Sequence, residues 1–375
     1  MIITIPASCE GRLLRSYLQL TLGLSTTTLS RLKKDERGIL VNGAHVTVRY
    51  VLHAGDVLSL ALDDTADTAT ETVLPCSGPL DVLFEDASLI VLNKPAGTPT
   101  HPSHGHLTDT LANALAFRYA GEGVPFVFRP LGRLDRNTSG VVVCGKTQAV
   151  AGFLGGCLKE RTVVKRYIAL LDGEMQADEQ VRTIDLPILQ PAAGVKMRTV
   201  CDPGTPGAEE AHSTYRVLCA GGGHTLVLAS PLTGRTHQLR VHFAALGHPI
   251  TGDDIYGTPS PLISRHALHC ASLSLPVPFF AAAAGVPPDA GAPVVSVPDV
   301  SAPVVSVPVV SVPVGPARRG LQPMRPLSPD TPLNIPSPDG WLHTWAPMPD
   351  DMEAAIEAVC PGSTAALTAR KILMQ

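Results

Sequence analysis

An aspartate flanked by arginines is the feature of this chain that most directly suggests chemistry. Asp135 lies two residues after Arg133 and just before Arg136, in the run PLGRLDRNTSGVVVCGKT at residues 130–147. Positive charge nearby favours the ionised form of a carboxyl group, and an ionised carboxylate can act as a nucleophile or as a base. An arbitrary aspartate before a strand usually caps a turn, so the wider context has to decide between the two roles.

The same run contains a match to a nucleotide-binding pattern. Residues 140–147, GVVVCGKT, fit the phosphate-loop pattern G-x-x-x-x-G-K-[ST] letter for letter. That pattern needs a flexible loop between a strand and a helix, whereas residues 141–144 are apolar and mostly β-branched, which is typical of a strand. We therefore predict a strand here and expect neither ATP nor GTP to bind.

Three other stretches combine apolar runs with basic, aromatic and histidine residues. They are FEDASLIVLNKPAGTPTHPS at 84–103, KRYIALLDG at 165–173 and PLTGRTHQLRVHFAALGHPITGDDIYG at 231–257. The run at 130–147 lies between the first and the second of these stretches. In this order along the chain, the four stretches resemble the motifs of RluA-like RNA pseudouridine synthases. Because four ordered motifs are far more specific than any one of them, the resemblance favours a catalytic role for the aspartate.

The match at 130–147 holds residue by residue, with one departure. The residues that match the family's hallmark are Arg133, Asp135, Thr138, Ser139 and Gly140. Many members have a histidine immediately before the arginine, where this chain has Gly132. The departure leaves the assignment of the aspartate intact and puts the contacts of the local loop in question.

The resemblance implies a reaction and a role for each matched residue. The family breaks the C–N glycosidic bond of a uridine and remakes the link through carbon 5 of the same base, with no redox change and no cofactor. By the match, Asp135 is catalytic and Arg240 pairs with it. Tyr167 and Leu239 lie against the target base, and Arg133 helps to open the base stack or fills the vacated space. The alternatives are a plain core role for Tyr167 and a phosphate or surface contact for Arg240.

An aromatic ring beside the target has a physical purpose. Stacking of a base on a ring is worth about 1–3 kcal/mol, which is comparable to the few kcal/mol needed to extrude a base from its stack.

Several histidines also lie in the motifs, at His101, His104, His106, His237 and His242. We expect the first three to hold no metal, since partner ligands are missing, and the last two to orient the backbone rather than to act as acid and base.

The first 62 residues have the pattern of a small separate module. Two helical patterns, RLLRSYLQLTL and TTTLSRLKKDE, precede the run ILVNGAHVTV. In that run Asn42 and Gly43 predict a tight hairpin, because both tolerate positive φ. The stretch resembles the alpha-L RNA-binding motif of a ribosomal small-subunit protein, which presents basic residues from its second helix and the following turn. Here those residues are Arg31, Lys33, Lys34 and Arg37. A solvated helix face is the alternative for such a run.

Composition shifts divide the rest of the chain. The prediction is an alpha-L domain at 1–62, a linker at 63–79, a catalytic domain at 80–275, a Pro/Val-rich insertion at 276–338, a return to the catalytic domain at 339–360 and a tail at 361–375. The insertion has 16 prolines in 63 residues and repeats APVVSVPDVS almost unchanged as APVVSVPVVS, which favours an extended segment. In the catalytic domain, strand-like and helical runs alternate. We predict an α+β fold with a central mixed, mostly antiparallel sheet.

Bulk properties limit the class of protein. The net charge is −4, yet residues 12–49 carry seven Lys or Arg against two acids and residues 129–166 carry eight against two, so local basic patches exist within an acidic average. Eight cysteines without a C-x-x-C pair suggest neither a disulfide framework nor a zinc site. The same scattered cysteines favour a reducing, cytoplasmic compartment. No signal-peptide pattern and no apolar run of membrane length occurs, so we expect no membrane attachment. We also expect a monomer that acts on RNA.

The sequence thus predicts an RNA pseudouridine synthase that needs no metal or cofactor. The attached module favours large-subunit ribosomal RNA as the substrate, because relatives that act on it commonly carry such a module. Two alternatives remain: a tRNA pseudouridine synthase of the same family, and a non-catalytic RNA-binding factor for ribosome assembly. Whether Asp135 attacks the sugar, attacks the base or removes a sugar proton is open.

Overall fold

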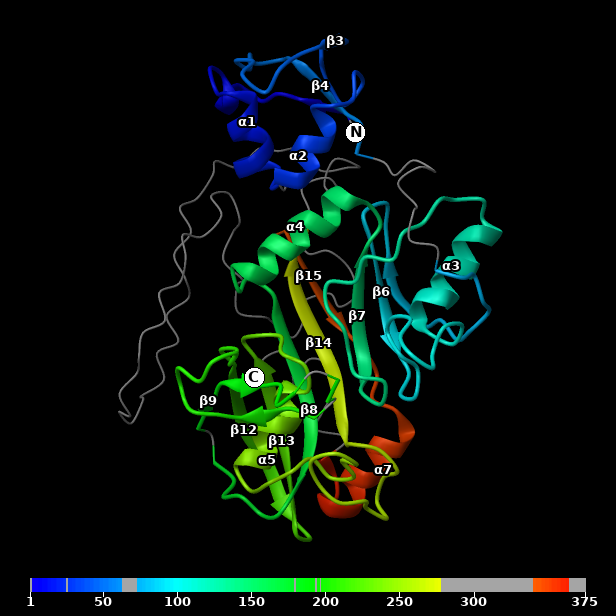
Figure 1. Cartoon of the computed structure of the whole chain (residues 1–375), viewed down its shortest axis with the longest axis vertical. Coiled ribbons are helices and arrows are strands. Elements are labelled where there is room, and N and C mark those ends of the chain that lie inside the picture. Colours follow the sequence, from blue (N-terminus) through cyan, green and yellow to red (C-terminus); the bar gives the residue numbers. More distant parts are fainter. Residues whose placement is uncertain are drawn as a thin grey trace.

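The protein is built on one long mixed sheet with helices at its faces and ends (Figure 1). The computed structural model describes residues 2–62, 73–277 and 340–363, apart from Ser25, Glu179, Ala193 and Lys196. The central sheet has nine strands in the order β5-β6-β7-β14-β8-β13-β12-β9, and β15 also pairs with β14. The β14 and β7 strands run parallel, whereas the other neighbouring strands of this sheet are antiparallel. The predicted α+β class with a mixed, mostly antiparallel sheet is confirmed.

The bounds of these elements are as follows. The strands of the central sheet are β5 (Val82–Glu85), β6 (Leu89–Lys94), β7 (Ser139–Gly145), β8 (Val164–Asp172), β9 (Arg182–Asp185), β12 (His212–Gly221), β13 (His224–Pro231), β14 (Leu268–Pro276) and β15 (Trp341–Trp345). A small ribbon joins β10 (Ile188–Leu189) to β11 (Thr199–Val200). The helices are α3 (Leu111–Gly121), α4 (Gln148–Lys159), α5 (Gln238–Ala245) and α7 (Asp350–Val359).

The middle strands are buried on both faces, which explains their unbroken apolar sequences. All seven residues of β7 and all nine of β14 are buried. The main core lies between the sheet and the apolar sides of α4, α5 and α7, whose buried members include Phe153, Phe243 and Ile356. A second cluster lies beneath α3, where Leu115 and Tyr119 pack on β6 and β7. Because both faces of these strands are packed, the loops that leave the strand ends begin from fixed positions.

The phosphate-loop pattern is a strand, as predicted. Its apolar residues lie in β7, paired with β6 from Leu89 to Lys94. Lys146 forms an ion pair of 2.6 Å with Glu85, and the Thr147 side chain caps the N-terminus of α4 by accepting from the Val150 N–H at 3.3 Å. The pattern therefore supplies a strand end and a helix cap, and not a loop that could wrap around phosphates.

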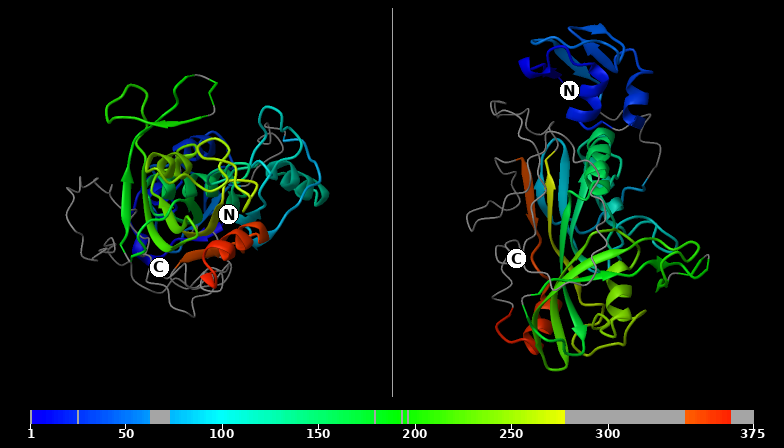
Figure 2. Two further views of the ribbon diagram at one scale, coloured as in Figure 1. Left: turned by 90° about the horizontal axis from the view of Figure 1, so that it is seen from below. Right: turned by 90° about the vertical axis from the view of Figure 1, so that its left-hand side faces the viewer.

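The N-terminal residues form a four-stranded module at one end of the long axis, over α4 (Figures 1 and 2). Its elements are β1 (Ile2–Thr4), α1 (Leu14–Ser16), the π-helical turn η2 (Tyr17–Thr21), α2 (Thr26–Leu32), β2 (Ile39–Val41), β3 (Ala44–His45) and β4 (Val57–Leu60). The predicted hairpin is confirmed, because Asn42 and Gly43 have φ of 52° and 81° between β2 and β3. The module has its own apolar core, which Ala149 of α4 joins.

The second helical pattern of this module is shorter than the sequence suggests. The pattern TTTLSRLKKDE continues to Glu36, whereas α2 ends at Leu32. The Asp35 carboxylate accepts a hydrogen bond of 2.8 Å from the Arg37 N–H. The Lys34 N–H already donates to the Arg31 carbonyl at 3.0 Å, an i→i−3 bond, so the chain has left the α-helical pattern before Asp35.

The segments that flank the catalytic region also have defined places. The Cys76 N–H donates to the Asn113 carbonyl of α3, so this part of the predicted linker lies against the catalytic region. Pro276 pairs with Trp341, which extends β14 one residue beyond the predicted boundary at 275. Residues 278–338 of the Pro/Val-rich insertion and residues 63–72 and 364–375 lie outside the described residues. No helix within the described ranges is long and apolar enough to cross a membrane.

Candidate active site

Asp135 lies in the loop that precedes β7, and neighbouring segments hold this loop by its backbone. The Thr100 hydroxyl donates to the Leu134 carbonyl at 2.9 Å, and the Leu134 N–H donates to the Thr100 hydroxyl oxygen at 3.2 Å. On the far side of Asp135, a guanidinium nitrogen of Arg265 donates to the Asn137 carbonyl at 3.0 Å. Anchors on both sides fix the aspartate even though it belongs to no helix or strand.

Lys94, the lysine of the Lys-Pro-Ala-Gly stretch, is a third anchor of the loop. Its side chain has no exposed surface, and its Nζ donates to the carbonyls of Pro95, Thr98 and Arg136 at 2.7–2.9 Å. Burial lowers the pKa of this amine to about 7, against which the negative charge of Asp135 acts. Lys94 therefore joins the end of β6 to the residue that follows Asp135.

The Thr-Ser-Gly sequence after Asp135 has a structural explanation. The Thr138 hydroxyl lies 2.8 Å from Nε2 of His266, and the Ser139 hydroxyl lies 2.9 Å from Nδ1 of His269. Gly140 has a φ of 111°, and a Cβ there would collide with the backbone of Cys270 in β14. Only glycine adopts that conformation without strain at such close range. These residues attach the beginning of β7 to β14.

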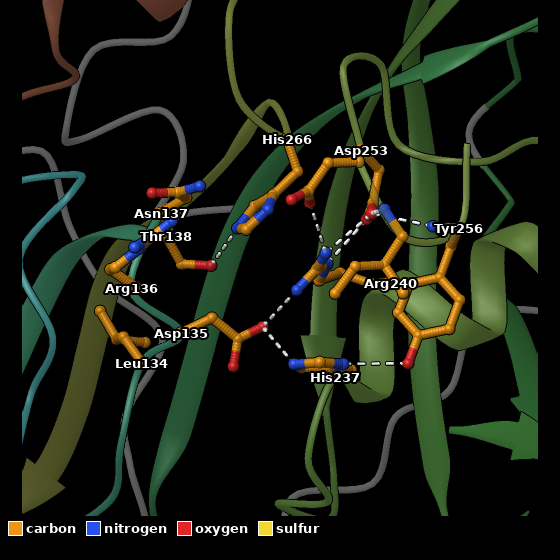
Figure 3. Close-up of polar contacts among 12 residues, drawn as sticks. Leu134, Asp135, Arg136, Asn137, Thr138, His237, Arg240, Asp253, Tyr256 and His266 are labelled. Atoms are coloured by element: carbon orange, nitrogen blue, oxygen red, sulfur yellow. Dashed lines mark hydrogen bonds and ion pairs between the residues drawn. The ribbon is translucent and has the colours of Figure 1, made fainter. Parts of the chain in front are cut away.

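Arg240 of α5 reaches Asp135 from the opposite side of the site (Figure 3). Its Nη1 donates to the Asp135 carboxylate at 3.2 Å, while Nε and Nη2 each donate to Asp253 at 2.7 Å. Burial alone would lower the pKa of the guanidinium, but its bonds to Asp253 raise it. Arg240 is thus a fixed cation that faces the aspartate, which is the contact that the sequence predicted.

Asp253 is the residue that orients this arginine. It is fully buried and also accepts hydrogen bonds from the N–H groups of Ile255 and Tyr256 at 2.9 and 3.0 Å. Burial disfavours its charge, yet Arg240 lowers the pKa of the Asp253 carboxyl below its usual value. The Tyr256 ring lies beside the same guanidinium, 5.3 Å from its centre. The planar arginine is therefore held along its edge and on one face.

The two histidines near α5 take different positions. His237 precedes the helix with a φ of 58°, its Nε2 lies 3.8 Å from the Asp135 carboxylate, and its Nδ1 lies 2.9 Å from the Tyr256 hydroxyl. Burial lowers the pKa of His237, so neutral imidazole is favoured. His242 is buried and lies 3.0 Å from both the Ser213 hydroxyl and the Leu186 carbonyl. His242 thus links α5 to its surroundings, as expected, whereas His237 borders the aspartate itself.

Two hollows meet at Asp135. The larger, about 650 Å³, is lined by the segment with His101, His104 and His106, by the Asp135 loop and by the residues that precede α5. The smaller, about 140 Å³, lies on the sheet side and is lined by Tyr167 and Leu239 among others. Arg133, Asp135 and Arg240 line both hollows. A carboxylate placed at this junction can touch a group that enters from the larger hollow into the smaller one.

The residues predicted to contact a base line the smaller hollow together. Tyr167 lies in β8 and Leu239 in the first turn of α5, and both are largely buried. Arg133 is exposed at the mouth. Segments separated by many residues of sequence are therefore brought to one place, because β8, β14 and β7 are neighbours in the sheet.

The four basic residues belong to α2 and the residues after it, in the N-terminal module, which Figure 1 shows at the opposite end of the molecule from α5. Lys33, Lys34 and Arg37 are exposed after the end of α2. Arg31 is half-buried, and its guanidinium donates to the Ala61 carbonyl at 3.3 Å. Arg31 therefore has a contact within the module that the sequence did not suggest.

Several residues of the site were not assigned from sequence. Asp253 and Tyr256 lie in the ITGDDIYG run, whose acidic and aromatic residues were a usable signal. His266 has no comparable signal, because its neighbour Thr138 is far away in the chain. Within the described parts of the chain, no group of three or more His, Cys, Asp or Glu side chains is placed to hold a metal ion, and His106 instead contacts Asp109 and Arg136.

Comparisons with known proteins agree on one family. Residues 88–245 match the family model for RNA pseudouridylate synthase. The chain is 37% identical over 253 residues to an uncharacterized RNA pseudouridine synthase, YjbO, of Bacillus subtilis, covering 68% of this chain and 87% of the relative. It is 33% identical over 290 residues to ribosomal large subunit pseudouridine synthase D of Nitrosomonas europaea, covering 74% and 80%. It is also 37% identical over 180 residues to the mitochondrial tRNA pseudouridine(32) synthase of Saccharomyces cerevisiae, covering 48% and 37%.

Proposed function

The chain belongs to the RluA-like family of RNA pseudouridine synthases, isomerases that act on RNA, and we propose that it isomerises a uridine of large-subunit ribosomal RNA on Asp135. The observation that carries the assignment of the aspartate is its 3.2 Å contact with Arg240 at the junction of the two hollows. Arg240, which two hydrogen bonds to Asp253 hold in place, keeps a positive charge beside the carboxylate.

A flipped uridine fits the arrangement of the two hollows. The RNA strand enters through the larger hollow, and the base enters the smaller one, between Tyr167 and Leu239. Arg133, exposed at the mouth, takes the space that the base leaves in its stack. In this pose the sugar lies at the junction beside Asp135. The carboxylate then starts the isomerisation by attack on the sugar, by attack on the base or by removal of a sugar proton.

Recognition of the RNA is proposed to lie in the N-terminal module, as an alpha-L type of RNA-binding domain. The exposed Lys33, Lys34 and Arg37 lie together after α2, where phosphate contacts add affinity without reading sequence. The relative named for the large ribosomal subunit aligns over 290 residues and the relative named for tRNA over 180. The longer alignment supports ribosomal RNA as the substrate. We also propose that the protein is a cytoplasmic monomer.

Pseudouridine mapping tests the proposal. Total RNA from cells with and without the gene is mapped, and the strain without it is complemented with the wild-type chain or with Asp135→Asn. We expect one or a few sites in large-subunit ribosomal RNA that wild type restores and Asp135→Asn does not. Sites confined to tRNA would replace the ribosomal substrate with the alternative one. Restoration by Asp135→Asn would overturn the role of the aspartate.

A further inference from the structure

Lys165 of β8 lines the smaller hollow. It is a cation, and the proposed steps on Asp135 give it no role. It lies two residues before Tyr167, so the two side chains share one face of the sheet. Lys165 lines the smaller hollow together with Tyr167, Leu239 and Asp135, and it does not line the larger one. A charged group on the inner side of a base-sized hollow needs an explanation.

The ammonium of Lys165 has no hydrogen-bond or ion-pair partner within the part of the chain that the structure describes. Burial lowers the pKa of this lysine, and the Cys270 thiol opposes the shift only as a thiolate. Burial raises the pKa of that thiol to about 11, so Cys270 is neutral at physiological pH. Lys165 is only partly buried and lines the open hollow, so a group that enters the hollow can become the partner that the protein does not supply.

Gly132 makes room for this ammonium. A Cβ at position 132 would lie 3.1 Å from the Lys165 Nζ, closer than a relaxed contact. The φ of Gly132 is outside the left-handed region, so a side chain there would meet the lysine head group rather than a strained backbone. The glycine that departs from the family's usual histidine therefore lies directly against the lysine. The two residues act as a pair that sets what the inner end of the hollow presents.

We infer that the Lys165 ammonium binds the carbonyl oxygens of the flipped uracil and stabilises the negative charge that this base carries once its glycosidic bond has broken. The inference rests on the proposed function. When the C1′–N1 bond breaks, its electron pair stays with the base, and the charge spreads over N1 and the two carbonyl oxygens. The C1′–C5 bond then forms, C5 loses its proton and N1 gains one, so the sum is an isomerisation without redox change.

Position favours the base over a phosphate as the partner. Phosphates of the strand stay outside the hollow, where Arg133 and Arg136 are exposed. Lys165 lies behind them, next to the ring of Tyr167 against which the base is proposed to lie. A cation in a site from which water is excluded acts strongly on charge that develops in the transition state, and removal of one such donor costs about 10²–10³ in rate.

Single-turnover kinetics on the full chain test the inference, with a transcript that contains the mapped uridine. Lys165→Met should lower the rate constant at saturating enzyme by about 10²-fold and leave the RNA dissociation constant unchanged. Lys159→Met, which removes an exposed lysine of α4, is the matched control and should leave both unchanged. Weaker RNA binding with an unchanged saturating rate would make Lys165 a phosphate contact and overturn the inference, as would wild-type values of both constants.

A second variant, Gly132→Ala, tests the same inference with Lys165 still present, so the result does not depend on whether Lys165→Met folds. Gly132→Ala should push the Nζ from its place and slow the same step, but it should have no effect in the Lys165→Met background. The wild-type rate should fall as pH rises through the lowered pKa of Lys165, and Lys165→Met should lack this fall. Neighbouring groups should not produce this fall, because the Tyr167 phenol and the nearby Cys270 thiol have raised pKa values. Burial lowers the pKa of His237, which also lines the hollow, so its imidazole is already neutral in this range, and the arginines stay protonated. If Asp135→Asn were active, the proposed function itself would be wrong, whereas the Lys165 results above concern only the inference.

Discussion

Arg240 and Asp253 form a buried ion pair in which two guanidinium nitrogens each donate to the carboxylate at 2.7 Å. The remaining Nη1 is directed to Asp135 at 3.2 Å. Since the plane of a guanidinium is rigid, fixing one edge of it fixes the direction of the third nitrogen. The distance between Arg240 and Asp135 is thus set by a residue that does not touch the aspartate, and Asp253 is a positioning residue of the site.

Asp253→Asn should therefore lower activity without removing any group that contacts RNA. Breaking a buried ion pair by changing one partner costs about 3–5 kcal/mol, because the other charge is left uncompensated. We expect a lower free energy of unfolding in urea and a lower saturating single-turnover rate in the fraction that remains folded.

The chain offers a matched control for that variant. Asp254 contacts the same arginine at 3.3 Å, but its side chain is 66% exposed. Asp254→Asn should change stability and rate little, since exposed ion pairs contribute about 0–1 kcal/mol. Equal effects of the two variants would mean that Asp253 does not set the direction of Arg240.

Tyr167 gives a second prediction, which separates its ring from its hydroxyl. If the ring stacks against the flipped base, Tyr167→Phe should retain most of the rate, whereas Tyr167→Ala should lose about 1–3 kcal/mol of binding to the flipped state. The phenol contacts the buried Cys270 thiol, so loss of the hydroxyl alone leaves the stacking face intact. Single-turnover rates of the two variants decide the matter, and a Phe variant as slow as the Ala variant would contradict the stacking role.

Local sequence patterns were sufficient to predict much of the fold. The β-branched residues 141–144 form a strand despite their match to a nucleotide-binding pattern, and Asn42-Gly43 forms the hairpin turn. Both features depend on residues adjacent in the chain. The end of α2 was wrong by four residues, because the backbone changes to i→i−3 hydrogen bonding at Lys34, and such a change is not visible in periodicity.

Contacts across the fold were harder to predict. The Arg240 contact with Asp135 was expected from motif resemblance and is present, while the catalytic role of Asp135 stays a prediction. The anchoring of Arg240 by Asp253 and the approach of Lys165 to Gly132 depend on how separate segments pack. No spacing rule in the sequence reports such packing. Residue type limits what a side chain can do, and the packing decides which partner it meets.

His269 gives a prediction on acid stability. It is fully buried, with Nδ1 at 2.9 Å from the Ser139 hydroxyl and Nε2 at 3.1 Å from the Ala346 carbonyl. The carbonyl can only accept, so Nε2 carries the proton and Nδ1 accepts from the serine. Burial lowers the pKa of this histidine to about 4.

The sign of the effect follows from proton binding. Between pH 6.5 and about 4 the unfolded chain binds a proton at His269 that the folded protein does not. Stability therefore falls as pH drops through this window. Urea unfolding from pH 7 to pH 4.5 should show a steeper loss for wild type than for His269→Gln, which can keep both hydrogen bonds but cannot take up the proton. Parallel curves for the two proteins would contradict the assignment.

Lys94 gives a prediction on stability in the alkaline range. Its pKa is lowered by burial from 10.5 to about 7, so between these values the unfolded chain binds a proton that the folded protein has released. The contribution of Lys94 to the free energy of unfolding should therefore rise with pH from about 7 to 10. Below pH 7 the residue is charged in both states, and this gain is absent.

The comparison with Lys94→Met isolates that contribution. The variant leaves the carbonyls of Pro95, Thr98 and Arg136 without their donor, and an unsatisfied buried acceptor costs about 1–3 kcal/mol. The difference in unfolding free energy between wild type and variant should widen as pH rises from 7 to 10. Because one of these carbonyls belongs to the residue after Asp135, the variant should also lose activity at pH values where it is still folded. A constant difference across this range would mean that the lysine keeps its proton in the folded protein and that its three carbonyl partners outweigh the effect of burial.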